Sequence, residues 1–96
     1  RWGGEEFILL LPDTDMRGAL VMAEKIRNTV EQHGFNDGVT DHRLTITSGV
    51  TEYDHKSVEI DDYIRKADTA LYWGKEQGRN RCYGYHYKMI TLQDLS

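Results

Sequence analysis

The sequence is poor in the residues that cross-link a chain or break it into segments, since its 96 residues include one cysteine and one proline. The single cysteine, Cys82, excludes an internal disulfide and a thiolate metal cage, which is typical of proteins from a reducing cytosol. The longest apolar runs, residues 7–11 and 19–23, are far shorter than the roughly 20 residues of a membrane-spanning helix. We therefore predict a cytoplasmic segment without membrane contact, although upstream segments could anchor a longer parent protein.

Positive charge is also scarce, because the formal net charge is -4 at pH 7. This balance argues against binding to nucleic acid or anionic lipid, so any phosphate site must be local. Hydrophobic residues at 39% and charged residues at 29% are ordinary for a globular protein, and the length allows one domain. The chain opens at Arg1 in what reads as the middle of a structural element, so we expect the N-terminal part of that domain to be missing.

The first half of the chain predicts a hairpin, a helix and a strand. Gly3 and Gly4 precede a β-compatible run over residues 7–11, as expected for a strand, a turn and a strand. A helix is predicted from about Met16 to His33, with Asp15 among the N-cap candidates and Gly34 as its stop. Alternating residues over 44–50 then predict a half-buried strand.

The second half predicts a helix and a last strand. Apolar residues recur at helical spacing from Ile60 to Gly74, with Ser57 and Asp61 as cap candidates and Gly78 closing the helix. Residues 81–85 are compatible with a strand, and residues 86–96 read as a C-terminal tail with linker character. We expect an α+β domain over residues 1–85, with two helices on one side of a mainly antiparallel sheet.

Two glycines followed by two carboxylates, Gly3-Gly4-Glu5-Glu6, form the most distinctive local pattern. Glycines let a ligand approach the backbone, and carboxylate oxygens suit a hard cation such as Mg²⁺ that also takes phosphate oxygens. Adjacent strand residues point to opposite faces, so only one of the two glutamates is expected to bind a metal directly. A solvated hairpin would explain the same residues, and spacing alone does not decide between the two interpretations.

Lys75 and Arg79 form a second pattern, four residues apart at the end of the second predicted helix. Two cations sharing a face there could bind a triphosphate, the lysine as a point charge and the arginine as a planar fork. Basic residues at a helix C-terminus also oppose the helix dipole, which stabilises by about 0.3–1 kcal/mol each. Capping alone would therefore account for both residues.

Three segments taken in order resemble the GGDEF family, the catalytic domains of diguanylate cyclases. They read RWGGEEF at residues 1–7, TITSGV at 45–50 and ADTALYWGKEQGRN at 67–80. The resemblance implies the C-terminal part of a fold akin to adenylyl-cyclase and polymerase palm domains, with a central antiparallel sheet flanked by helices. It also implies the condensation of two GTP molecules into cyclic di-GMP with release of pyrophosphate.

The resemblance assigns roles to particular residues. Glu5 matches the acidic position that binds Mg²⁺ or Mn²⁺, Gly3 and Gly4 pass close to the nucleotide, and Glu6 belongs to the same catalytic signature. Arg1 matches a basic residue that steadies the transition state. Lys75 and Arg79 match residues that hold the terminal phosphates. Gly74 departs from the alanine usual in the family, which should loosen the helix by about 1 kcal/mol.

The resemblance also implies partners. Each domain holds one GTP, so joining two requires a homodimer with facing half-sites, and an upstream sensory or regulatory domain is expected. The 96-residue chain alone should be inactive, because a second metal-binding aspartate and the guanine-recognising groups have no counterpart in it. The alternative is a degenerate GGDEF module that binds GTP or cyclic di-GMP and regulates a neighbouring domain.

Overall fold

The computed structural model describes residues 14–33, 35–36, 38–39, 41–42, 44–53, 59–86 and 88–95. The hairpin predicted over residues 3–11 lies outside them. Along the chain the elements are α1 (Met16–His33), β1 (Phe35–Asn36), β2 (Asp41–His42), β3 (Ser48–Val50), α2 (Ile60–Glu76), β4 (Cys82–Tyr85), β5 (Met89–Ile90) and the 3-10 turn η1 (Gln93–Leu95).

Helix α1 has the bounds that the sequence predicts. It begins after Asp15, whose carboxylate Oδ1 accepts a hydrogen bond of 2.8 Å from the backbone N–H of Gly18. This is the N-cap geometry that satisfies one of the unpaired N–H groups of the first turn. The buried side chains of α1 recur three and four residues apart, at Met16, Ala19, Leu20 and Ala23, and form the face that packs on the sheet.

Helix α2 is confirmed, with Gly78 just past its end, but Asp61 is not its N-cap. The N-cap residue is Glu59, which makes no side-chain capping bond. Asp61, predicted as a cap, lies inside the first turn with Asp62, where both carboxylates interact favourably with the positive end of the helix dipole. Ser57, the other cap candidate, lies outside the described residues.

The described sheet is mixed. β3 pairs with β4 in parallel, with Ser48 opposite Cys82, whereas β5 pairs with β4 antiparallel, with Gly84 opposite Ile90. The parallel pairing follows from the connection, because α2 carries the chain back to the starting edge before β4 begins. The α+β class with a sheet flanked by helices is confirmed. The antiparallel arrangement holds, within this sheet, for β4 and β5.

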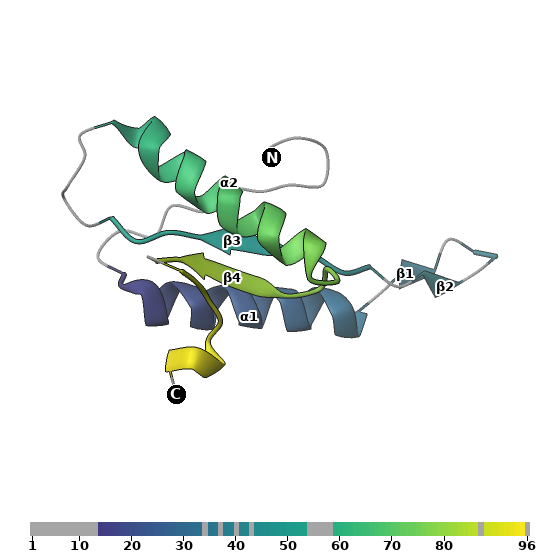
Figure 1. Ribbon diagram of the computed structural model, residues 1–96. Coiled ribbons are helices and arrows are strands. Elements are labelled where there is room, and N and C mark those ends of the chain that lie inside the picture. The colour runs from purple at the N-terminus through teal and green to yellow at the C-terminus, as the bar shows by residue number, and fades with distance from the viewer. Residues whose placement is uncertain are drawn as a thin grey trace.

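The two helices lie on opposite faces of the sheet, so the prediction that both pack on one side is wrong (Figure 1). Alternation along β4 explains the arrangement, since successive strand residues point to opposite faces. Cys82 belongs to the core cluster with Met16 and Leu20 of α1. Tyr83 instead lies on the α2 face, where its ring is close to Gly74.

The main apolar core lies between α1 and the sheet. Its buried residues are Met16, Leu20, Ala23, Cys82 and Ile90, and Val50, Leu92 and Leu95 pack against them. Three of these eight residues come from the segment predicted as a linker-like tail. Residues 89–95 therefore pack as part of the folded body, and β5 extends the sheet. The domain boundary predicted after Tyr85 stays a prediction.

On its other face the sheet approaches α2 closely through glycines. A Cβ on Gly49 would overlap the backbone carbonyl oxygen of Ala67 and backbone atoms of Leu71. A Cβ on Gly74 would meet side-chain atoms, the Thr47 methyl at 2.9 Å and the Tyr83 ring at 3.3 Å. Gly74, expected from the sequence only to loosen the helix, thus also lets α2 lie close to the sheet.

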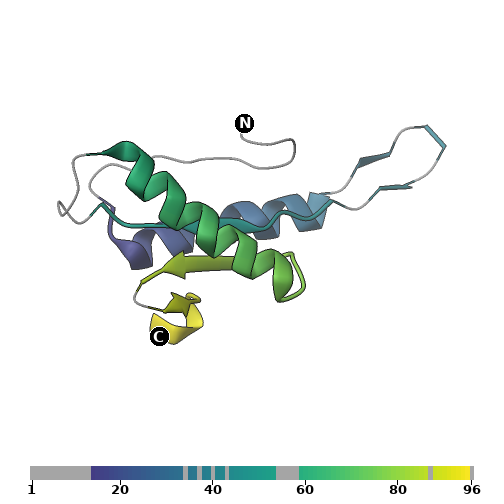
Figure 2. The same cartoon turned by 45° about the horizontal axis from the view of Figure 1, so that its top comes forward.

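The residues between α1 and β3 include a two-stranded hairpin. β1 and β2 pair antiparallel, with Phe35 opposite His42. Between them Gly38 has φ +95°, a conformation that glycine adopts readily, and the Val39 side chain is 90% exposed. The hairpin projects beyond the end of α1 (Figure 2).

The thiol of Cys82 makes the stability of the core depend on pH. Burial, together with the charge and hydrogen bond of Glu24, raises its pKa from 9.0 to about 12. Because the unfolded thiol ionises first, the free energy of unfolding should fall as pH rises above about 9, and the loss should continue to about pH 12. Denaturant titrations at pH 8 and pH 10 should show wild type losing about 1 kcal/mol more than Cys82→Ala. Equal losses in both proteins would contradict this.

Candidate functional site

The residues predicted to carry chemistry fall into two groups. Arg1, Gly3, Gly4, Glu5 and Glu6 lie outside the described residues. Lys75 and Arg79 are described, and they mark the part of the candidate site that the structure positions. Across the described ranges no three histidine, cysteine, aspartate or glutamate side chains are grouped closely enough to hold a metal ion.

Lys75 and Arg79 do not share a helical face. Lys75 is half-buried in the last turn of α2, but the helix ends at Glu76, so Arg79 lies beyond it. The N–H of Arg79 donates to the carbonyl of Gly74 at 3.0 Å, and that of Gly78 to Lys75 at 3.4 Å. These two bonds define a Schellman C-cap, which requires positive φ at its glycine position, here +122° at Gly78. The helix terminus therefore sets the direction of Arg79.

The backbone stays left-handed past the glycine. Arg79 has φ 62° and Asn80 has φ 51°. This conformation costs roughly 1–2 kcal/mol for a residue with a Cβ and is best tolerated by asparagine and aspartate. The Arg79 side chain is exposed, and its carbonyl oxygen accepts a 3.0 Å hydrogen bond from Nε of Arg81. A strained turn thus presents the candidate phosphate-binding arginine.

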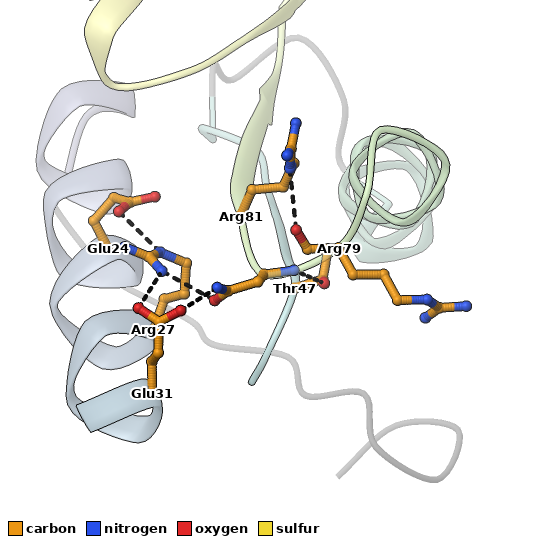
Figure 3. Close-up of polar contacts among 7 residues, drawn as sticks. Glu24, Arg27, Glu31, Thr47, Arg79 and Arg81 are labelled. Carbon is orange, nitrogen blue, oxygen red and sulfur yellow. Dashed lines mark hydrogen bonds and ion pairs between the residues drawn. The ribbon is translucent and has the colours of Figure 1, made fainter. Parts of the chain in front are cut away.

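A polar cluster that the sequence did not predict joins this turn to α1 (Figure 3). Arg27 is at its centre, with Nε 3.0 Å from Glu24 and Nη1 3.5 Å from Glu31. The same Nη1 donates to Oδ1 of Asn80 at 3.0 Å, and Nδ2 of Asn80 donates to the Glu31 carboxylate. The spacing of Glu24, Arg27 and Glu31 predicts ion pairs along one helix. The same spacing does not predict the contact with Asn80, which lies 53 positions from Arg27 in the sequence.

The electrostatics of the cluster favour a permanently charged guanidinium. Burial lowers the pKa of Arg27, but the hydrogen bond and charge of Glu24 and the charge of Glu31 outweigh it, and the net direction is upward. The Arg27 side chain is only 17% exposed, which limits screening by water. Its charge is therefore available to hold Asn80 at any physiological pH.

The chain belongs to the family described as "Diguanylate cyclase, GGDEF domain", which matches residues 1–81. It is 39% identical over 82 residues to a diguanylate cyclase of Vibrio cholerae serotype O1, covering 85% of this chain and 25% of that protein. It is 43% identical over 81 residues to diguanylate cyclase DgcM of Escherichia coli K12, covering 84% of this chain and 19% of that protein. The chain thus spans a quarter or less of these relatives.

A solved structure gives a similar result for the fold. The solved structure of the active GGEEF domain of a diguanylate cyclase from Vibrio cholerae is similar to this chain, with a TM-score of 0.77 and 40% sequence identity. The match covers 90% of this chain and 54% of that one. The likeness agrees with the family assignment. Within the described residues, no helix has both the length and the apolar character needed to cross a bilayer.

Proposed function

We propose that the protein containing this chain is a diguanylate cyclase that condenses two GTP molecules into cyclic di-GMP and pyrophosphate. One observation carries the proposal. Residues 3–7 read GGEEF, the same five letters that name the active Vibrio cholerae domain, which is 40% identical to this chain. Lys75 and Arg79 are both present as well, at the end of α2 and in the turn that follows.

The chemistry divides among the residues as follows. Lys75 and Arg79 bind the terminal phosphates, and Arg1 offsets negative charge that builds up during transfer. Gly3 and Gly4 let the nucleotide approach the backbone, while Glu5, with Glu6 beside it, provides carboxylate oxygens for Mg²⁺ or Mn²⁺. A metal ion held by these carboxylates would supply positive charge against the phosphates. The 3′-hydroxyl oxygen of one GTP bonds to the α-phosphorus of the other, the α–β bridge breaks and pyrophosphate leaves, and the hydroxyl proton passes to Glu5 or to solvent. The reciprocal step closes the ring.

The reaction needs two nucleotides, which suggests the active assembly. One domain that binds one GTP supplies half of a site, so two copies facing each other in a homodimer would complete it. The relatives are about four times or more the length of the matched segment. A regulatory or sensory domain elsewhere in the full-length protein is therefore part of the proposal.

Product analysis tests the function directly. The full-length protein is incubated with GTP and Mg²⁺, and the nucleotides are separated by chromatography. Cyclic di-GMP together with pyrophosphate is the expected result. Binding of GTP or cyclic di-GMP without any product would instead favour a degenerate module that regulates a neighbouring domain.

Replacement of Lys75 should separate phosphate binding from helix capping. Lys75→Ala in the full-length protein should weaken binding of a GTP analogue with a non-cleavable α–β bridge by roughly 10- to 100-fold, as expected for a lost charged hydrogen bond. Calorimetry measures the affinity. Lys66→Ala is the control, because it removes the same charge from the same helix at a residue that is not assigned to the phosphates. Nζ of Lys66 lies instead 5.5 Å from the Tyr63 ring centroid. Unchanged affinity in Lys75→Ala would mean that Lys75 serves only to cap the helix.

A further inference from the structure

Asn80 connects three parts of the fold. Its backbone N–H donates to Oγ1 of Thr47, just before β3, at 2.9 Å. Its side-chain amide donates to Glu31 and accepts from Arg27 at 3.0 Å, and both partners lie on α1. An amide is suited to this position because it presents a donor to the carboxylate and an acceptor to the guanidinium at the same time.

These contacts act on a turn that needs support. Arg79 and Asn80 both adopt left-handed backbone, which persists only where surrounding contacts hold it. The Arg79 side chain extends away from the cluster of Glu24, Arg27 and Glu31 (Figure 3). Asn80 is thus fixed on one side of the turn while Arg79 is presented on the other.

We propose that Asn80, held by Arg27 and Glu31, is a positioning residue that orders the turn and so fixes the direction of the Arg79 guanidinium. This inference rests on the proposed function, in which Arg79 contacts the terminal phosphates. A released turn would have to be ordered when the nucleotide binds, and that ordering lowers affinity. Helix α1, which carries none of the predicted site residues, thereby contributes to nucleotide binding through Arg27 and Glu31.

Asn80→Asp is the sharpest variant, because it keeps the shape, the tolerance for left-handed backbone and the acceptor for Arg27. It replaces the donor facing Glu31 with a second carboxylate, which repels. In the full-length protein, affinity for the non-cleavable GTP analogue should fall between a few-fold and about tenfold. Adding Glu31→Gln restores a donor and acceptor pair with the roles exchanged. The double variant should therefore return to within about twofold of wild-type affinity.

A double-mutant cycle with Arg79→Ala distinguishes positioning from general stability. Asn80→Asp should have no further effect on affinity once Arg79 is alanine, because the group it positions is gone. An equal loss in both backgrounds, unchanged affinity in Asn80→Asp, or failure of Glu31→Gln to rescue would each overturn the proposal. An Arg79→Ala variant with wild-type affinity would show that the proposed phosphate contact itself is wrong, and the positioning role with it.

Two further variants distinguish a loss of positioning from a loss of fold. Arg27→Lys keeps the positive charge but lacks the planar fork that reaches Glu24 through Nε and Asn80 through Nη1. It should therefore reproduce the affinity loss if Asn80→Asp does not fold. Ile90→Val trims the core on the far strand β5 and should lower thermal stability without changing affinity. Arg27→Lys with wild-type affinity, or an affinity loss in Ile90→Val as large as that in Asn80→Asp, would overturn the positioning role.

Discussion

Replacement of Glu5 by glutamine in the full-length protein should remove cyclic di-GMP synthesis while leaving the fold intact. Glutamine keeps the size of the side chain but loses the charge that a hard cation requires. Metal stabilisation of phosphoryl transfer is worth several kcal/mol, so the rate should fall at least about a hundredfold. Chromatographic assay of cyclic di-GMP measures it.

The matched control is Glu59→Gln, the same chemical change at the exposed N-cap of α2, at the opposite end of the helix from Lys75. It should retain wild-type turnover. Near-wild-type turnover in Glu5→Gln would refute the assignment of Glu5 as a metal ligand. Equal loss in both variants would point to a general effect of charge.

Gly49→Ala should be the most destabilising single-methyl change in the described part of the chain. The new Cβ would overlap backbone atoms of α2 at Ala67 and Leu71, and no rotamer change can relieve a clash with backbone. Overpacking typically costs 1–3 kcal/mol, and this site should reach about 3 kcal/mol or prevent folding. A loss of 3 kcal/mol corresponds to a drop of roughly 12–24 °C in melting temperature, which thermal unfolding measures.

Gly74→Ala is the control for that experiment, since it adds the same methyl to the same interface from the helix side. Its Cβ would meet the Thr47 methyl and the Tyr83 ring rather than backbone. The strain is offset by a gain of about 1 kcal/mol in helix propensity, so the net change should be small. A small effect at Gly49 and a large one at Gly74 would contradict the observed packing of α2 on β3.

The helices could be predicted from the sequence because their signals are local. Asp15 as a cap, the apolar period and Gly34 together define α1 without reference to the rest of the fold. The side of the sheet on which each helix packs is not local information. It depends on β4 alternating between Cys82, which faces α1, and Tyr83, which faces α2, and on a parallel pairing set by residues more than 30 positions apart.

In the candidate site, too, residues with local sequence signals were predicted and long-range contacts were not. Lys75 and Arg79 were identified by their spacing and by resemblance to the family. The helical period placed them on one face, whereas the Schellman cap at Gly78 ends the helix between them. Asn80 carried no signal, because its partners Arg27 and Glu31 are far away in sequence. The roles of Arg1, Gly3, Gly4, Glu5 and Glu6 stay predictions.

The contribution of the last strand to the core also affects the order in which the protein can be made. Ala23 on α1 belongs to the same core cluster as Ile90, which comes 67 positions later in the chain (90 minus 23). At synthesis rates of about 5–20 residues per second, the apolar face of α1 waits about 3–13 s for β5 to be translated. During that interval the nascent chain exposes an apolar surface, which can bind chaperones or lead to aggregation.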